Sequence, residues 1–416
     1  MGDYVGIIFD KTYILPHNFY TEKNIPRILR YINKIPILII SNKHSDDYFD
    51  KNNSLYDDII FYDFDNINKE LDKLSHIKYL INQGESEILL TDYLCNVLCI
   101  KCNPIKYSSS RLDKFLMNER LKECGLSYLK SCKCSNINDI IKFYNETKNS
   151  SYEIKSNTHY NCIHDSYICY TLNELIDTYY LILDETNDNL VYINEKLYGE
   201  KYIFNTISNN YIHKFISIWK SEFIHESNNE NYIIKKNTLM DCADVSNNII
   251  LYCLNILNSL EIINGPANVE IINTKNGPYL INCMTKCGID ETMDNMFINE
   301  LIGYSQEETM LYAYCSKIEF NNIPSLYDIK KDYNNCIINL STNLNKLIWN
   351  DNYLDKIIDL KSIFKIDIKY KDGEVINNKL TNFGNIYLIS HSKKIFDNDM
   401  NVILQWIKNL NIKIKN

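Results

Sequence analysis

The first hundred residues alternate short apolar runs with amphipathic stretches. Apolar residues dominate at 4–9, 36–41 and 59–64, and each run is long enough for one strand. Strands that alternate with helices favour a parallel sheet, so we expect a small α/β domain over residues 1–105. No GxGxxG motif follows the first run, and the sequence therefore predicts no dinucleotide fingerprint there.

Beyond residue 105 the same mixed pattern continues without an internal repeat or a long linker. We expect one lobe over 106–190, a second over 191–315 and a C-terminal lobe over 316–416. The fold class predicted for the whole chain is α/β, with α+β lobes after the first domain. The expected strands are 152–155, 166–170, 190–195, 201–207, 212–220, 336–340, 364–370 and 385–390, and the expected helices are 112–123, 172–183, 247–260 and 400–410.

Two Gly-Pro pairs, Gly265-Pro266 and Gly277-Pro278, stand out because the chain has only 11 Gly and 7 Pro. The runs 268–272 and 279–283 lie between and after them and meet across a tight connection at Lys275-Asn276-Gly277. This arrangement predicts an antiparallel hairpin.

Pairing symmetric about Asn276 places Glu270 opposite Asn282, with their Cβ atoms about 5 Å apart. Oxygen ligands on one face of a hairpin are suited to a divalent cation and the phosphates it neutralises. A solvated strand face would have the same polar pattern, so both interpretations stay open on the hairpin alone. The polar face would also carry Asn268, Met284 and Lys286, and the core face Val269, Ile271, Ile281 and Cys283.

Composition narrows the function classes. The formal net charge of -9 and the pI near 5.5 argue against binding to nucleic acid or to an anionic membrane. The N-terminus lacks the features of a signal peptide, and the longest apolar runs are too short to span a bilayer, so the cytoplasm is the expected compartment. The 14 Cys are then expected to be reduced. The sequence contains no pair of CxxC motifs, so it does not predict a zinc site.

Several sparse motifs follow one another in an informative order. Lys114 stands at a helix start in "RLDKFLMNERLKECGL", and Lys155 ends a strand in "SYEIKS". An extended run at 191–220, broken once at Gly199, precedes the hairpin that carries Glu270. This order resembles the ATP-grasp superfamily, and specifically the carboxylate-amine ligases of the L-amino-acid ligase type, relatives of the bacilysin-forming and carnosine-forming enzymes.

The likeness covers nearly the whole chain. "GESEILLTDYLCNVLCIKCNP" resembles the family's Gly-x-x-Glu helix that leads to an Asn-Pro, here Asn103-Pro104, and the last segment resembles its C-terminal lobe. The resemblance implies an ATP-grasp fold with an N-terminal parallel-sheet pre-ATP-grasp domain and a C-terminal lobe. It also implies ATP and Mg²⁺ as cofactors, and small-molecule carboxylate and amine substrates, with amino acids favoured. It allows a homodimer.

Site residues can be inferred from the resemblance position by position. Lys114 and Lys155 match the two lysines that reach the ATP phosphates. Glu270 and Asn282 match the two Mg²⁺ ligands, and Lys286, which we group with Glu270 as catalytic, replaces an Arg that contacts phosphate or the substrate carboxylate. The other positions implied to bind the nucleotide are Ser156, which begins the loop after Lys155, and the inter-lobe strand residues Asn194, Glu195, Lys196 and Leu197, among which Glu195 matches the ribose ligand.

Three departures from the family pattern weaken the expected metal site and phosphate loop. Asn282 stands where a second carboxylate is usual, Met284 stands where an Asn is expected, and the loop after Lys155 contains no Gly. Fewer carboxylates and fewer oxygen ligands should weaken Mg²⁺ binding. His213 and Trp219 match a strand that leads to the substrate pocket, although a hydrogen-bonded structural histidine would give the same pattern at His213.

Two functions are favoured, because a third class, an interaction module that binds no nucleotide, would require the match of both lysines to be accidental. The first is an ATP-dependent carboxylate-amine ligase that forms an amide or peptide bond through an acyl phosphate. The second is an impaired or repurposed ATP-grasp protein that binds nucleotide without turnover. The lysines and Glu270 favour the first, whereas Asn282, Met284 and Lys286 favour the second.

Overall fold

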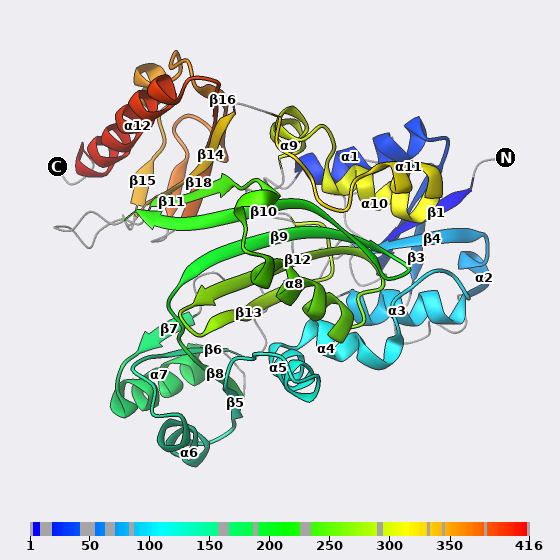
Figure 1. The fold of residues 1–416 in the computed structure, drawn as a ribbon, viewed down its shortest axis with the longest axis horizontal. Helices are drawn as coiled ribbons and strands as arrows, with labels where there is room; N and C mark the ends of the chain where they lie inside the picture. The colour runs from blue at the N-terminus through cyan, green and yellow to red at the C-terminus, as the bar shows by residue number, and fades with distance from the viewer. Residues whose placement is uncertain are drawn as a thin grey trace.

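The computed structural model describes residues 3–8, 19–41, 55–62, 71–82, 87–156, 166–185, 190–224, 234–288, 294–330, 333–342, 346–377 and 381–413. Within these ranges the strands form one parallel and three antiparallel sheets. Figure 1 shows the largest sheet in the middle, the N-terminal elements at one end of it and the C-terminal elements at the other. No helix of the described part is long and apolar enough to cross a membrane.

The N-terminal domain is the small parallel sheet that the alternating pattern predicts. Its strand order is β3-β2-β1-β4, and all three pairings are parallel. The central strand is apolar throughout, with Val5, Ile7 and Ile8 fully buried. The expected strand ends at 9 and 64 lie outside the described residues. The elements of the domain are β1 (Tyr4–Ile8), α1 (Phe19–Tyr31), β2 (Ile35–Ser41), β3 (Asp58–Tyr62), α2 (Leu71–Leu74), β4 (Ile77–Asn82) and α3 (Ile88–Val97).

A second, antiparallel sheet of four strands forms a separate small lobe with the order β5-β8-β6-β7. We expected the lobe boundary at residue 190, but β8 pairs with both β5 and β6 of the small sheet. The chain therefore changes sheet after Glu195, in the linker at 196–199. The elements are β5 (Ser131–Cys134), α6 (Ile137–Thr147), β6 (Tyr152–Ser156), β7 (Ser166–Cys169), α7 (Leu172–Glu185) and β8 (Val191–Glu195).

The large sheet has eight strands in the order β13-β12-β9-β10-β11-β14-β18-β16. Its last three strands come from the C-terminal segment, so lobe B and the C-terminal lobe share one continuous sheet. These strands are β9 (Glu200–Asn209), β10 (Ile212–Ile224), β11 (Ile234–Leu239), β12 (Asn264–Thr274), β13 (Gly277–Met284), β14 (Asn334–Thr342), β16 (Ile363–Ile368) and β18 (Thr381–Ser390).

Helices cover this sheet along its length (Figure 1). The helix α8 buries Ile249, Cys253, Ile256 and Leu257 against the strands, which makes the main hydrophobic core. The remaining elements are the short helices η5 (Ile105–Tyr107), η6 (Cys242–Asp244) and η8 (Asp351–Lys356), the two-stranded sheet of β15 (Lys346–Ile348) and β17 (Val375–Asn377), and the helices α8 (Asn247–Ser259), α9 (Asn295–Leu301), α10 (Gln306–Cys315), α11 (Lys317–Asn322) and α12 (Lys393–Lys413).

The helix expected at 112–123 begins two residues later, at Lys114, and a separate short helix precedes it. The helix α4 (Ser108–Leu112) ends before Asp113, and α5 (Lys114–Glu123) begins after it. Asp113 Oδ1 accepts hydrogen bonds from the backbone N of Phe115 at 2.9 Å and of Leu116 at 3.1 Å, which is the N-cap geometry. The break places Lys114 in the first turn of α5, at the helix start that the sequence predicts.

The hairpin of β12 and β13 has the predicted register at its critical pair, because Glu270 lies opposite Asn282. The register then shifts, and Ile271 pairs with Leu280. This β-bulge turns Ile281 away from the core, where we expected it, and buries Leu280 in its place at 2% exposure. Symmetric pairing was therefore wrong beyond Glu270.

Candidate active site

Glu270 of β12 forms an ion pair with Lys201 of β9. Lys201 Nζ lies 2.5 Å from Glu270 Oε2, and the two side chains are 29% and 16% exposed. Burial alone would raise the pKa of the Glu270 carboxyl, but the ammonium groups of Lys201, Lys235 and Lys114 outweigh burial and lower that pKa to about 2. Glu270 is therefore charged throughout the physiological pH range.

Lys114 and Lys155, the two expected phosphate ligands, are close neighbours across the small lobe. Burial lowers the pKa of Lys155 to about 8, and the nearby ammonium groups of Lys114 and Lys196 lower it further, against the attraction of Glu153. The Lys155 Nζ lies 5.2 Å from the centre of the Tyr192 ring, whose π face attracts cations. The structure thus brings together two lysines that are 41 positions apart in the sequence; their role toward phosphate stays a prediction.

The end of β8 and the linker that follows it carry the remaining expected nucleotide contacts. Asn194 is buried, and its Nδ2 donates to Glu153 Oε2 at 3.2 Å and to Glu195 O at 2.9 Å, so this side chain is already used within the lobe. Glu195 Oε1 accepts from Lys130 N at 3.0 Å, which fixes one of its two carboxylate oxygens. Lys196 N donates to Ser151 O at 3.0 Å, and Leu197 follows in the part of the linker without regular structure.

Gly199 allows this linker to approach the large sheet closely. A Cβ at this position would lie 2.2 Å from the backbone O of Asn273, at the end of β12. Only glycine fits so close to another backbone. The linker is therefore held against the same hairpin that carries Glu270.

Ser156 is the last residue of β6, directly after Lys155. The loop that follows, at 157–165, lies outside the described residues, as does the Ser156 side chain. The interpretation of this loop as a phosphate cover therefore stays a prediction.

The expected metal ligands face each other, but they fit a divalent cation poorly. Glu270 is paired with Lys201, and Asn282 offers one carbonyl oxygen. Met284 lies opposite Asn268, and a thioether is a poor ligand for Mg²⁺. No cluster of three or more His, Cys, Asp or Glu suited to a metal occurs in the described part of the chain. Lys286, two residues beyond the end of β13, is buried at 6% exposure.

His213 and Trp219 lie in structural environments. His213 Nδ1 is 2.7 Å from Ser208 Oγ, and its Nε2 is 3.1 Å from Asn258 Oδ1. Burial lowers the pKa of His213, which favours the neutral imidazole. Trp219 is fully buried and donates from Nε1 to Ser217 Oγ at 2.9 Å. These contacts favour the structural interpretation that the sequence left open for His213.

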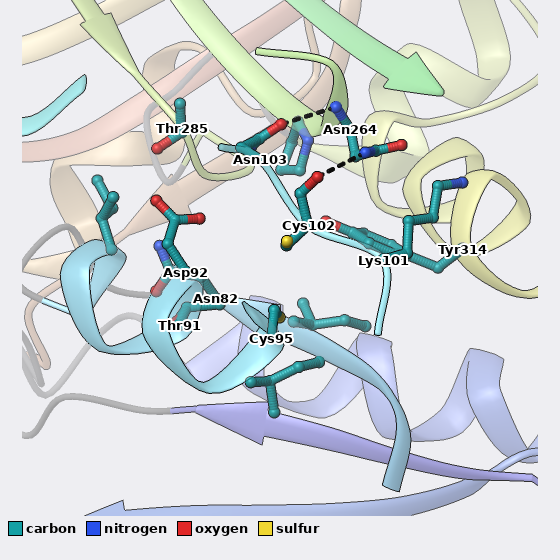
Figure 2. Close-up of a pocket in the computed structure, with 14 residues that line it drawn as sticks. Asn82, Thr91, Asp92, Cys95, Lys101, Cys102, Asn103, Asn264, Thr285 and Tyr314 are labelled. Atoms are coloured by element: carbon teal, nitrogen blue, oxygen red, sulfur yellow. Dashed lines mark hydrogen bonds between the residues drawn. The ribbon is translucent and has the colours of Figure 1, made fainter. Parts of the chain in front are cut away.

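A pocket of about 30 Å³ lies where the N-terminal domain meets the large sheet (Figure 2). Two hydrogen bonds close one side of it: Asn264 N donates to Asn103 Oδ1 at 2.8 Å, and Asn264 Nδ2 donates to Cys102 O at 2.7 Å. Its lining includes Thr285, which stands next to Lys286. The pocket thus reaches the end of the hairpin that carries Glu270, although its volume is suited to a few waters only.

Polar groups from α3 and the segment after it line this pocket. Thr91 Oγ1 is buried and has no hydrogen-bond partner among the described residues. Lys101 Nζ donates to Asn209 Oδ1 at 2.5 Å and to Ala313 O at 2.8 Å, and burial lowers its pKa to about 8. Of these groups, the Thr91 hydroxyl is the one that stays available to a polar ligand among the described residues.

Sequence reasoning missed Lys201 and Lys235. Both lie in strands of a lysine-rich chain, and no spacing distinguishes them from solvated residues. It also missed Arg111, although this residue stands only three positions before Lys114. Arg111 is 1% exposed, and its NH2 donates to Asp92 Oδ2 at 2.8 Å. A buried arginine cannot be recognised without the position of its carboxylate.

Comparisons with known proteins agree on the fold. No protein-family model and no curated protein matches the sequence. Solved structures do match over nearly the full chain. They include an L-amino acid ligase from Bacillus licheniformis (12% identity, TM-score 0.68, 98% of this chain and 97% of that chain), a phosphoribosylglycinamide synthetase from Anaerococcus prevotii (14%, 0.64, 97% and 98%) and a carboxyaminoimidazole ribonucleotide synthase from Aspergillus clavatus with ATP (12%, 0.68, 98% and 99%).

Each of these solved proteins is an ATP-grasp enzyme, and each aligns with the N-terminal parallel sheet, the small lobe and the large sheet together, since almost none of either chain is left out. The resemblance inferred from the motifs is therefore confirmed at the level of architecture. The chain has the ATP-grasp fold.

Proposed function

We propose that this protein is an ATP-dependent carboxylate-amine ligase. The observation that carries the proposal is the position of Lys114, which lies near enough to act on both Lys155 and Glu270, within an ATP-grasp fold. Ammonium groups that lie close together and are partly buried repel one another and are poorly solvated. A polyanion such as the ATP phosphate chain therefore stabilises their charged form strongly. The linker at 196–199 would contact the adenine through its backbone, and Glu195 the ribose.

The proposed reaction has two steps. A carboxylate oxygen of the acid attacks the γ-phosphorus, the bond from that phosphorus to the β,γ-bridging oxygen breaks, and ADP leaves with an acyl phosphate formed. The amine nitrogen then attacks the acyl carbon, the C–O bond to phosphate breaks, and the amine loses a proton as the amide forms. Lys114 and Lys155 would hold the phosphates in both steps, and Lys286 would hold the carboxylate or the transferred phosphoryl group.

No step of this proposal is assigned to a metal ion, because Glu270 and Asn282 fit one poorly. When Mg²⁺ is bound in such a cleft, it supplies charge neutralisation at the phosphates. In this chain the lysines are suited to supply much of that charge.

Amino acids are the substrate class that we favour for the acid and the amine. The support is the similarity to the L-amino acid ligase. Other similar structures act on larger substrates, one of them bound to ADP and 5-aminoimidazole ribonucleotide, so the test must include both types.

The test is an ADP-release assay with the full chain, ATP, MgCl₂ and pairs drawn from a panel of amino acids and aminoimidazole ribonucleotide, with product masses measured in parallel. We expect ADP release that requires both an acid and an amine, together with a new mass equal to their sum less one water. ATP binding without ADP release for any pair would contradict the ligase proposal and favour the nucleotide-binding alternative.

A further inference from the structure

The carboxylate of Glu270 is neutralised by a lysine, whereas a divalent cation would neutralise it in a metal-dependent site. Mg²⁺ prefers near-octahedral oxygen ligands and is usually held by one or two carboxylates together with phosphates. Glu270 is the carboxylate of the hairpin, and the residue opposite is an amide, Asn282. At this position the ammonium group of Lys201 already contacts the carboxylate, at 2.5 Å.

The strand register makes this contact a fixed feature of the sheet. Ile203 lies opposite Glu270, and Lys201 lies opposite Ile272, two residues along each strand. Lys201 and Glu270 are therefore diagonal neighbours on one face of adjacent strands, within reach of a long side chain. A dication that bound Glu270 would have to displace Lys201 and would then lie next to its like charge.

Two further lysines, Lys235 and Lys114, act on Glu270 of the same pair, and Lys114 also acts on Lys155. The charged groups that act most strongly on Lys155 and Glu270 are the ammonium groups of Lys114, Lys196, Lys201 and Lys235 and the carboxylate of Glu153. Positive charge therefore dominates the space between the small lobe and the hairpin. These ammonium groups can compensate the negative charges of a polyanion that binds without a metal ion.

We propose that Lys201 takes the place of the divalent cation at Glu270, so that this chain binds metal-free ATP as tightly as ATP with Mg²⁺. The inference rests on the proposed function, since it concerns the same nucleotide. It goes beyond that function because it specifies the ionic form of the ligand and the residue responsible. Lys201 acts here as a positioning and counter-charge residue.

The test is the dissociation constant of ATP for the full chain, measured by titration calorimetry in excess EDTA and again in MgCl₂. We expect the two constants to agree within about threefold, which is less than 1 kcal/mol. Binding that is weaker in EDTA by about tenfold or more overturns the inference and leaves the nucleotide proposal standing. No binding in either buffer overturns both.

Two variants identify the residue responsible. Lys201→Met should weaken binding in EDTA by about tenfold, and MgCl₂ should restore part of the loss because Glu270 is released as a ligand. Lys220→Met is the matched control: Lys220 pairs with Glu200 at 2.6 Å on the neighbouring strands and is similarly exposed, at 26%. A Lys201→Met protein that binds ATP like the control in both buffers contradicts the inference.

Glu270→Gln keeps the shape of the site and frees Lys201 to approach the phosphates. We expect ATP binding at least as tight as in the wild type, with no dependence on MgCl₂. A loss of affinity that occurs in MgCl₂ alone would identify Glu270 as a metal ligand and overturn the inference. This variant remains informative if Lys201→Met does not fold.

Discussion

At the scale of single residues, the proposed site depends on lysines whose positive charge is unfavourable until an anion binds. Burial and Lys114 both oppose the protonated form of Lys155. The resemblance of motifs identified Lys114 and Lys155 because each stands beside an element boundary that can be read from the chain. Lys201 could not be identified, because its importance comes from a contact with Glu270 across two strands that are far apart in sequence.

The low pKa of Lys155 predicts a pH dependence of ATP binding. In the free protein Lys155 loses its proton as the pH rises through about 8, well below the usual value near 10.5. ATP requires the ammonium form, so its affinity should fall by up to about tenfold per pH unit above 8. Lys155→Arg stays charged and should give a flatter profile. Identical profiles for the two proteins between pH 7 and 9.5 would contradict this prediction.

The lowered pKa of Lys155 has the opposite effect on the stability of the free protein, which increases as the pH rises. Between pH 8 and 10.5 the unfolded chain retains a proton at Lys155 that the folded protein has lost. The contribution of this one group to the free energy of unfolding therefore increases across that window.

Removal of Lys114 tests the phosphate role directly. Lys114→Met should weaken ATP binding by about tenfold to a hundredfold, which is the usual worth of a hydrogen bond to a charged group. Lys122→Met, on the exposed side of the same helix, is the control and should bind ATP normally. Equal affinities in a fluorescence titration of the two variants would exclude Lys114 from the site.

At the scale of elements, the sequence predicts the existence of strands and helices better than their partners. The extended run that contains β8 and β9 predicts strands of one lobe, yet its two strands belong to different sheets. Apolar alternation is the same for either partner, so the change of sheet at the linker is invisible in the pattern. The bulge that exchanges Ile281 for Leu280 is hidden for the same reason, because both residues are apolar.

The linker itself can be tested at Gly199. Gly199→Ala places a Cβ against the backbone O of Asn273, so the linker or the strand end must move. We expect the free energy of unfolding to fall by about 1–3 kcal/mol, which lowers the melting temperature. We also expect weaker ATP binding. Gly125→Ala is the comparison: its φ of +73° is strained in the variant, but its Cβ meets nothing within 4 Å. A smaller effect at Gly199 than at Gly125 would show that the close approach is unimportant.

At the scale of the whole molecule, buried polar contacts join the N-terminal domain to the rest of the ATP-grasp core. Arg111 links Asp92 of α3 to the backbone O of Leu260, just after α8, with donor distances of 2.8 and 3.0 Å. The architecture could be predicted from the order of motifs, since the fold fixes that order. The contacts between the lobes could not be predicted, because they depend on individual buried ion pairs such as that of Arg111 with Asp92.

Arg111→Met tests this connection. The variant leaves the Asp92 carboxylate buried without its partner, and we expect a loss of about 3–5 kcal/mol in the free energy of unfolding. The double variant Arg111→Met with Asp92→Leu should recover much of the loss, since no unpaired charge remains. Urea titrations of the three proteins provide the measurement. A single variant within 1 kcal/mol of the wild type would contradict the structural role.

The proposed transfer of phosphate from ATP to a carboxylate can be followed through the oxygen atoms. The acid substrate found in the ADP-release assay is labelled with ¹⁸O in its carboxylate, and the inorganic phosphate is analysed by mass spectrometry. We expect one ¹⁸O in the phosphate for each amide formed, because the oxygen of the acyl phosphate leaves with the phosphoryl group. Phosphate that contains no ¹⁸O while amide accumulates would contradict this transfer.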